Sequence, residues 1–255
     1  DPWNARSASD ALELYTNGIN YYREHVQPSV RIHYHIQDAG QVVNVVPDYS
    51  RIWVRVRDIT REGLVPVYDQ VKKMAGGAAI MANVDHNVSL ISGIHDLLPN
   101  RTGGAAMQKN LENLGDIIYT QEEIDFAIQM QKENGKPIIG IDGKIRPLRE
   151  TLESPGGGST DVGDVSYNVP VVSLAATTAP KGVPWHSWSV VASSGMSIGH
   201  KGMLHATKAL GMTMIDIFKD KKLREEIKKE FDERMGNYKY DPFLNPGPPP
   251  IDYVD

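Results

Sequence analysis

The stretch Arg51-Ile-Trp-Val-Arg-Val-Arg-Asp-Ile59 alternates aliphatic residues with arginines and a tryptophan. Because successive side chains of a strand point to opposite faces, this alternation predicts a strand with one buried face and one exposed face. Val30–Ile36 alternates in the same way, and Pro47-Asp48-Tyr49 is typical of a turn between the two. We therefore expect both stretches in one antiparallel sheet.

Helical periodicity flanks these strands on both sides. Asp10–Val26 repeats apolar residues at helical spacing, and Ser7 precedes it as an N-cap. Arg61–Met74 shows a second apolar stripe, with Thr60 as its cap and Gly76-Gly77 as an expected stop.

A further strand is expected at Val84–Ile94. Residues 1–98 then run helix, strand, strand, helix, strand, which predicts a ferredoxin-like α/β sandwich that lacks its opening strand. The chain starts at Asp1-Pro2-Trp3 without an initiator Met, so we expect it to be part of something longer.

Beyond Pro99 the pattern changes to helices separated by loops. The expected elements are helices at Gly104–Leu114, Thr120–Asn134 (capping box Thr120 and Glu123), Gly202–Phe218 and 219–234, a hairpin at Ile138–Ile145, a Gly/Pro loop at Pro155–Gly158, a buried strand at Val169–Ala175 and a proline-rich extended tail at 237–255.

Composition excludes several classes of protein. The chain has 255 residues with a net charge of −5, and this acidic balance argues against a nucleic-acid partner. No uninterrupted apolar run is long enough to span a membrane. With no cysteine, disulfides, thiolate nucleophiles and Cys-ligated zinc are excluded, so histidines and carboxylates remain as metal ligands.

Asn44 and Arg57 are candidate substrate contacts. Asn44 lies just before a turn, where an amide often satisfies local backbone groups, and that reading stays open. The alternative is that an amide and a guanidinium on one small sheet bind a peptide-like carbonyl and a carboxylate. Arg51, Arg55 and Arg57 share one strand face, which is equally typical of a solvated sheet surface.

Asp161 and Asp164 fall in the glycine-rich stretch Gly158–Ser166. No Lys-Ser/Thr follows its glycines, so a Walker phosphate loop is excluded. The two carboxylates either cap a tight turn or orient and neutralise a cationic centre. Their spacing alone does not decide between these roles.

His186 and His200 are the candidate histidines. His186 lies in a loop between Trp185 and Trp188. It could be a metal ligand or a packed loop residue. His200 sits at an expected helix start, where the helix dipole disfavours the charged imidazole. A neutral His200 would be available as a donor or a ligand.

Four sequence elements together resemble one known family. Asn44-Val-Val-Pro-Asp48 with Arg57, Gly158-Ser-Thr-Asp-Val-Gly-Asp-Val-Ser166, His186-Ser-Trp188 and Ser197-Ile-Gly-His-Lys-Gly-Met203 resemble the aminoacylase/glutamate-carboxypeptidase superfamily of di-metal amidohydrolases. The likeness extends over nearly the whole chain. It implies an α/β fold, in which an α+β lid interrupts a catalytic domain.

The resemblance also implies a division of the chain and roles for its residues. Residues 1–98 match the ferredoxin-like lid and dimerisation domain, and residues 99–236 match the C-terminal part of a phosphorylase/hydrolase-like catalytic domain. His186 falls on a metal ligand, and Asn44 and Arg57 fall on lid positions that contact substrate. Asp161, Asp164 and His200 are left as residues that could orient the ligands.

The remaining ligands and the general base are expected before Asp1. The intact protein would then be a cytoplasmic homodimer using two zinc or manganese ions per site to cleave an N-acyl or N-aroyl amino acid, such as a glutamate amide. The alternatives are a dipeptidase or an N-acyl-amino-acid hydrolase. For this chain alone, a non-catalytic dimerisation and substrate-binding module is the further alternative.

Overall fold

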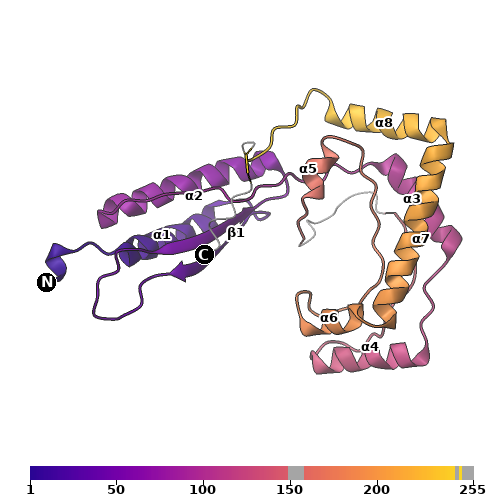
Figure 1. The fold of residues 1–255 in the computed structure, drawn as a ribbon, viewed down its shortest axis with the longest axis horizontal. Coiled ribbons are helices and arrows are strands. Elements are labelled where there is room, and N and C mark those ends of the chain that lie inside the picture. Colours follow the sequence, from indigo (N-terminus) through magenta and orange to yellow (C-terminus); the bar gives the residue numbers. More distant parts are fainter. Residues whose placement is uncertain (149–157, 245–246, 249–255) are drawn as a thin grey trace. The chain divides into compact units, whose positions relative to one another are not determined.

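The structure is a computed structural model that describes residues 1–148, 158–244 and 247–248. The chain divides into two compact units, which we describe separately. The described part of the first unit comprises residues 1–96, 158–164, 241–244 and 247–248, and that of the second comprises residues 97–148 and 165–240. Strands occur in the first unit, and the second is built from helices and extended segments (Figure 1).

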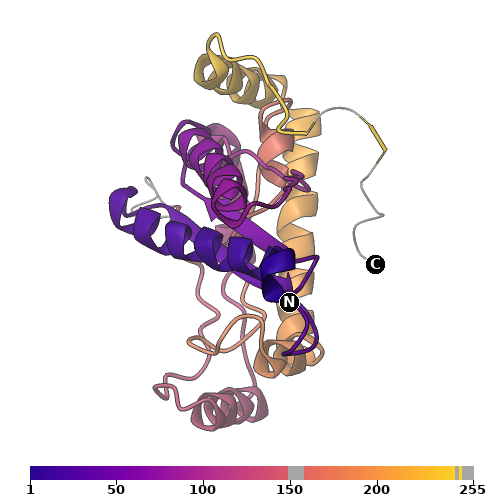
Figure 2. The same cartoon turned by 90° about the vertical axis from the view of Figure 1, so that its left-hand side faces the viewer.

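The first unit consists of a β-hairpin and two long helices. Its elements are η1 (Pro2–Asn4), α1 (Ala8–Tyr22), η2 (Arg23–His25), β1 (Arg31–Asp38), β2 (Arg51–Arg57) and α2 (Arg61–Ala82). The Ser7 and Thr60 side chains accept from the N–H groups of Asp10 and Gly63, so both expected N-caps are confirmed. The helices α1 and α2 lie side by side (Figures 1 and 2).

The core of this unit lies between the two helices and one face of the hairpin. It combines helix and strand residues: Tyr15, Ile19, Val30, Ile32, Val67, Val71 and Ala78. Ile19 is fully buried, and Val54 and Val56 of β2 pack against the same cluster. Burial of this apolar face is what holds the hairpin on the helices.

The sheet is antiparallel, with Ile32 opposite Val56 and His33 opposite Arg55. Directly opposed residues share a face, so the predicted alternation is confirmed: aliphatic side chains face the helices, while the arginines and histidines face away. The structure therefore has the mixed α/β class expected from the sequence.

Two expectations for this unit are wrong. Val84–Ile94 is not a strand, and β1 and β2 form the whole sheet within the described residues. Asp85, His86 and Asn87 interrupt its apolar pattern with residues that disfavour strands. Gly76-Gly77 does not end α2, because burial of Ala78 and Ala79 one step further outweighs the helix penalty of the glycines.

The second unit contains five longer helices among its described residues: α3 (Arg101–Leu114), α4 (Gln121–Glu133), α6 (Trp188–Ser194), α7 (Ser197–Lys219) and α8 (Lys221–Met235). The short α5 (Val162–Ser166) spans the boundary between the units. The capping box of Thr120 and Glu123 is confirmed by both of its hydrogen bonds. The helices α5 and α6 were expected to be loops.

Two further strand expectations are wrong. Ile138–Ile145 forms no hairpin, although the Ile117 N–H donates to the Gly143 carbonyl. Val169–Ala175 forms no strand, and Val169 is half exposed. A strand needs a neighbour to satisfy its backbone groups, and the described residues supply none here. The expected Gly/Pro loop and tail lie partly outside the described residues.

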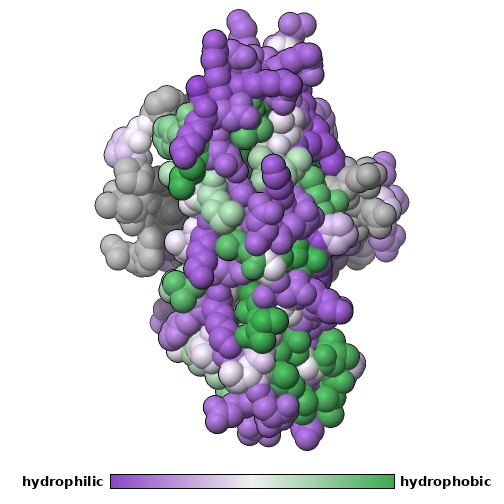
Figure 3. All heavy atoms as spheres, turned by 90° about the vertical axis from the view of Figure 1, so that its right-hand side faces the viewer, coloured by the Kyte–Doolittle hydropathy of each residue, from purple (hydrophilic) through white to green (hydrophobic). Residues whose placement is uncertain are grey.

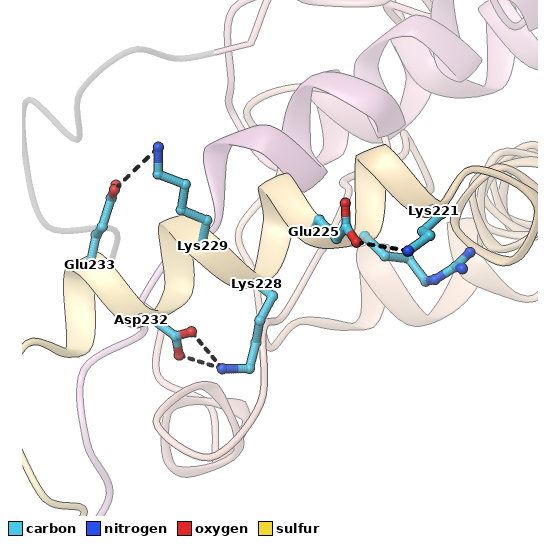
Figure 4. Close-up of a pocket in the computed structure, with 7 residues that line it drawn as sticks. Lys221, Glu225, Lys228, Lys229, Asp232 and Glu233 are labelled. Carbon is cyan, nitrogen blue, oxygen red and sulfur yellow. Dashed lines mark hydrogen bonds and ion pairs between the residues drawn. The ribbon is translucent and has the colours of Figure 1, made fainter.

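The start of α3 is held by α8. The Glu230 carboxylate accepts from the N–H groups of Arg101 and Thr102, and the Asn100 side chain donates to the Ile227 carbonyl. Exposed i,i+4 pairs cover the outer face of α8, among them Lys221–Glu225, Lys228–Asp232 and Lys229–Glu233 (Figure 4). Such pairs contribute only ~0.2–0.5 kcal/mol each, as expected for a solvated helix face.

One face of α7 is apolar yet exposed. Its exposed apolar residues are Met203, Leu204, Leu210, Met214, Ile215 and Phe218. Figure 3, which views the molecule from the side of α7, shows apolar areas interrupting the hydrophilic surface. An exposed stripe of this length is unusual for an isolated globular unit.

Candidate functional site

Asn44 and Arg57 lie at opposite ends of the hairpin. Asn44 is exposed in the loop that joins β1 to β2, whereas Arg57 is the last residue of β2. Six residues of extended strand separate the two ends of β2, which is about 20 Å. Within one protomer, the structure therefore does not bring these two candidates onto one small ligand.

Asp164 contacts His95 in the first unit. The His95 Nδ1 lies 2.8 Å from the Asp164 carboxylate, and the His95 backbone N–H donates to the same group. On its other side, His95 Nε2 lies 3.1 Å from the Arg61 guanidinium, which also pairs with Asp241 at 2.8 Å. The Arg61 guanidinium stacks over the Phe243 ring.

These contacts select one tautomer of the buried His95 ring. A guanidinium is always a donor, so Nε2 of His95 accepts from Arg61 and carries no proton. Its proton must then be on Nδ1, where it is donated to Asp164. Asp164 thus orients the His95 ring, while Asp161, the other carboxylate of the motif, is exposed.

Asp164→Ala is expected to lower the free energy of unfolding by about 2–3 kcal/mol, because it leaves the His95 ring N–H buried without this acceptor. Asp164→Asn should recover part of the loss, since the amide oxygen can still accept. Urea denaturation measures both, with Asp161→Ala as the exposed control. Equal losses at positions 161 and 164 would contradict the assignment.

Gly163 and Ser166 of the same motif also contact the backbone of neighbouring segments. A Cβ at position 163 would lie 2.1 Å from the His95 carbonyl oxygen, so only glycine fits this approach. In the second unit, the Ser166 hydroxyl accepts from the Leu98 N–H. The motif is therefore used for packing at Gly163, Asp164 and Ser166.

His186 is exposed in the second unit and has an unusual backbone. Its φ is +62°, and the other non-glycine residue of the described chain with positive φ is Asn83, which caps the end of α2. Among described residues, no hydrogen bond or ion pair engages its imidazole. Left-handed backbone at a non-glycine residue costs about 1–3 kcal/mol and is typical of functional positions.

The stretch that contains His200 forms the start of α7. A Cβ at Gly202 would lie 2.2 Å from the Thr177 carbonyl oxygen, which explains that glycine. Lys201 donates to the buried Glu123 at 2.6 Å and to the Ile118 carbonyl at 2.9 Å. His200 itself is exposed. Sequence reasoning missed the Lys201–Glu123 pair, although it had assigned Glu123 to the capping box.

Glu123 and Glu230 make the second unit sensitive to acid. Burial alone raises the pKa of Glu123, but hydrogen bonds from Lys201, Ser197 and the Thr120 N–H lower it to about 2. Burial likewise raises the pKa of Glu230, but the N–H groups of Arg101 and Thr102, with the Thr102 hydroxyl and Arg234, lower it to about 2.

A carboxylate with a lowered pKa stabilises the fold above its unfolded pKa near 4.5. We therefore expect each group to lose about 2–3 kcal/mol of stability as pH falls from 4.5 to 2. Urea titrations across this range measure the loss, and Glu123→Gln should flatten the pH dependence. An unchanged slope in that variant would count against this cause.

Comparison with known proteins identifies relatives along most of the chain. It is 33% identical over 254 residues to a subunit of the p-aminobenzoyl-glutamate hydrolase of Escherichia coli (strain K12), with 90% of this chain and 53% of that protein covered. It is 25% identical over 233 residues to the Xaa-Arg dipeptidase of Homo sapiens, with 90% of this chain and 46% of that protein covered. No protein-family model matches the chain.

These relatives belong to the aminoacylase/glutamate-carboxypeptidase superfamily of amidohydrolases, the family that the sequence elements resemble. The chain spans about half the length of the curated relatives that it matches. The names of the two relatives specify different amino acids, glutamate in one and arginine in the other.

A metal site needs more ligands than the described residues gather. Among residues 1–148, 158–244 and 247–248, no group of three or more His, Asp or Glu side chains could hold a metal ion. His186 therefore does not form a metal site with other described residues.

None of the described helices combines the length and the hydropathy needed to cross a bilayer.

Proposed function

We propose that this chain contributes part of an amidohydrolase that cleaves an N-acyl or N-aroyl amino acid, with p-aminobenzoyl-glutamate-like amides as the substrate class. The similarity to a p-aminobenzoyl-glutamate hydrolase subunit over 90% of the chain carries this proposal. In the reaction, the oxygen of water bonds to the amide carbonyl carbon and the C–N bond breaks. The products are a carboxylic acid and a free amino acid.

His186 is the residue of this chain that we propose as a metal ligand. Its exposure and its left-handed backbone support the role. The imidazole is not packed against its own unit and can therefore bind a metal there, and backbone strain of this kind is typical of functional positions. The metal would be zinc or manganese, and its other ligands and the general base would come from outside these residues.

Arg57 is proposed to hold the substrate carboxylate. A guanidinium binds a carboxylate through two parallel hydrogen bonds, which fixes the orientation of the amino acid. Asn44 lies about 20 Å away along the hairpin, so it can contact the same substrate only from a second copy of the chain.

A homodimer through the first unit is therefore part of the proposal. Both strands of a two-stranded sheet are edges, and an edge can pair with a copy across a two-fold axis. We expect light scattering to give twice the chain mass at micromolar concentration. A monomer at every concentration tested would contradict the dimer.

The exposed apolar stripe of α7 is the kind of surface that another part of the hydrolase would cover. We propose that it packs against the portion of the catalytic domain that the longer relatives include and this chain does not match. Met214→Lys should then weaken association with that portion in a pull-down. Unchanged association in this variant would contradict the assignment.

A dipeptidase or another N-acyl-amino-acid hydrolase is the second candidate, favoured by the similarity to Xaa-Arg dipeptidases. Amine release by the complete protein from an aroyl-glutamate, an N-acetyl amino acid and an Xaa-Arg dipeptide separates the candidates. We expect the highest kcat/KM for the aroyl-glutamate. Turnover of the dipeptide alone would replace the first candidate with the second.

A further inference from the structure

The hairpin face that turns away from α1 and α2 is cationic. Three cross-strand pairs form it: Arg31 with Arg57, His33 with Arg55, and His35 with Trp53. None of these six positions holds a carboxylate, although the chain as a whole has a net charge of −5. Arg57 is half-buried, and the other five residues are exposed.

Like charges stand close together on this face. Arg31 stands directly opposite Arg57, where side chains of an antiparallel pair are ~5 Å apart at Cβ, and like charges in such positions destabilise a sheet. Arg55 is the next residue on the same face, ~7 Å along β2. Three guanidiniums are thus gathered within reach of one small ligand.

The two arginines beside Arg57 differ in how they are held. Arg31 Nη1 donates to the backbone carbonyls of Pro28 and Val30, which anchors this guanidinium and leaves further N–H groups to donate. Arg55 makes no hydrogen bond or ion pair within the described part of the chain. One guanidinium is thus preorganised and the other adaptable.

From this juxtaposition we propose that Arg31 and Arg55 bind the side-chain carboxylate of an acidic amino acid while Arg57 binds its α-carboxylate. The proposal rests on the proposed function and names its substrate class: amides of glutamate or aspartate. Two carboxylates on one short amino acid need neighbouring cations, and a bidentate guanidinium suits each of them.

The same face should discriminate between a glutamate amide and an Xaa-Arg dipeptide, the substrates that the names of the two relatives specify. A glutamate amide brings a second negative charge to the three guanidiniums, whereas a C-terminal arginine brings a positive one. Like charges placed together at a binding site reject a ligand as effectively as complementary charges select one. The face therefore favours the acidic class and disfavours Xaa-Arg dipeptides.

Binding to the 255-residue chain tests the proposal without catalysis. NMR titrations compare N-acetyl-glutamate, N-acetyl-glutamine and N-acetyl-arginine. We expect N-acetyl-glutamate to bind at least about tenfold more tightly than N-acetyl-glutamine, and Arg31→Gln or Arg55→Gln to remove most of this preference. Arg31→Lys should restore part of it, because lysine keeps the charge but lacks the fork.

Arg6→Gln is the matched control, because it removes one exposed positive charge of the same unit that does not belong to either strand of the hairpin. Equal affinity for the three ligands, or an equal loss in Arg6→Gln and Arg31→Gln, would overturn the proposal. In the complete protein, hydrolysis with equal kcat/KM for glutamate and glutamine amides would overturn it while leaving the proposed function intact. Selective binding without any hydrolysis by the complete protein would support the binding proposal and contradict the proposed function.

Discussion

Replacing Glu123 by alanine should destabilise the second unit by about 3 kcal/mol. The change removes the carboxylate that pairs with Lys201 and that caps α4 at the Thr120 N–H, so two stabilising contacts are lost together. Breaking a buried pair by removing one partner costs about 3–5 kcal/mol, and the partial exposure of Lys201 reduces that figure here. Urea denaturation at pH 7 measures the effect.

Glu122→Ala is the matched control, because this neighbouring carboxylate is exposed in the same first turn of α4. We expect it to change stability by less than about 0.5 kcal/mol. In the double variant Glu123→Ala, Lys201→Met, part of the loss should be regained, since no unpaired ammonium remains. Additive losses in the double variant would show that the two side chains do not depend on one another.

His186→Ala should have the largest effect on activity in the complete hydrolase. Loss of a residue that only orients a ligand typically costs 10–100-fold in metal affinity or activity, and loss of a ligand itself should cost at least about a hundredfold. Because His186 is exposed and contributes no core packing, the melting temperatures of the two proteins should agree when both are measured without metal. The bound metal per chain should fall along with kcat/KM.

His200→Ala serves as the control for His186, since it removes another exposed histidine of the same unit. We expect less than about a tenfold change in kcat/KM and unchanged metal content. If His186→Ala kept full activity and full metal content, the ligand would have to be sought elsewhere. Equal large losses at both positions would indicate that the two histidines act together.

The helices were predictable because their signals are local. Ser7, Thr60 and the Thr120–Glu123 box each mark a helix start within four residues, and the structure confirms all three caps. The strands depend on partners distant in sequence. Val30–Ile36 and Arg51–Ile59 pair with each other, whereas Val169–Ala175 pairs with no strand in the described chain.

The candidate site was predictable only as residue types. Sequence reasoning singled out Asp164, but its partner His95 lies 69 residues away and no spacing connects the two. The same holds for Lys201 and Glu123, which lie 78 residues apart in the sequence. The separation of Asn44 from Arg57 also needed the strand register, because position in sequence does not show which end of a hairpin a residue occupies.

The claim that this chain belongs to an amide-hydrolysing enzyme is tested most directly with isotopic water. The complete protein, supplied with zinc or manganese, is incubated with an N-aroyl-glutamate in ¹⁸O-labelled water, and the products are analysed by mass spectrometry. We predict one labelled oxygen in the carboxylate of the aroyl product and none in the glutamate released with it. Intact substrate after prolonged incubation, or products that carry no label, would contradict the account.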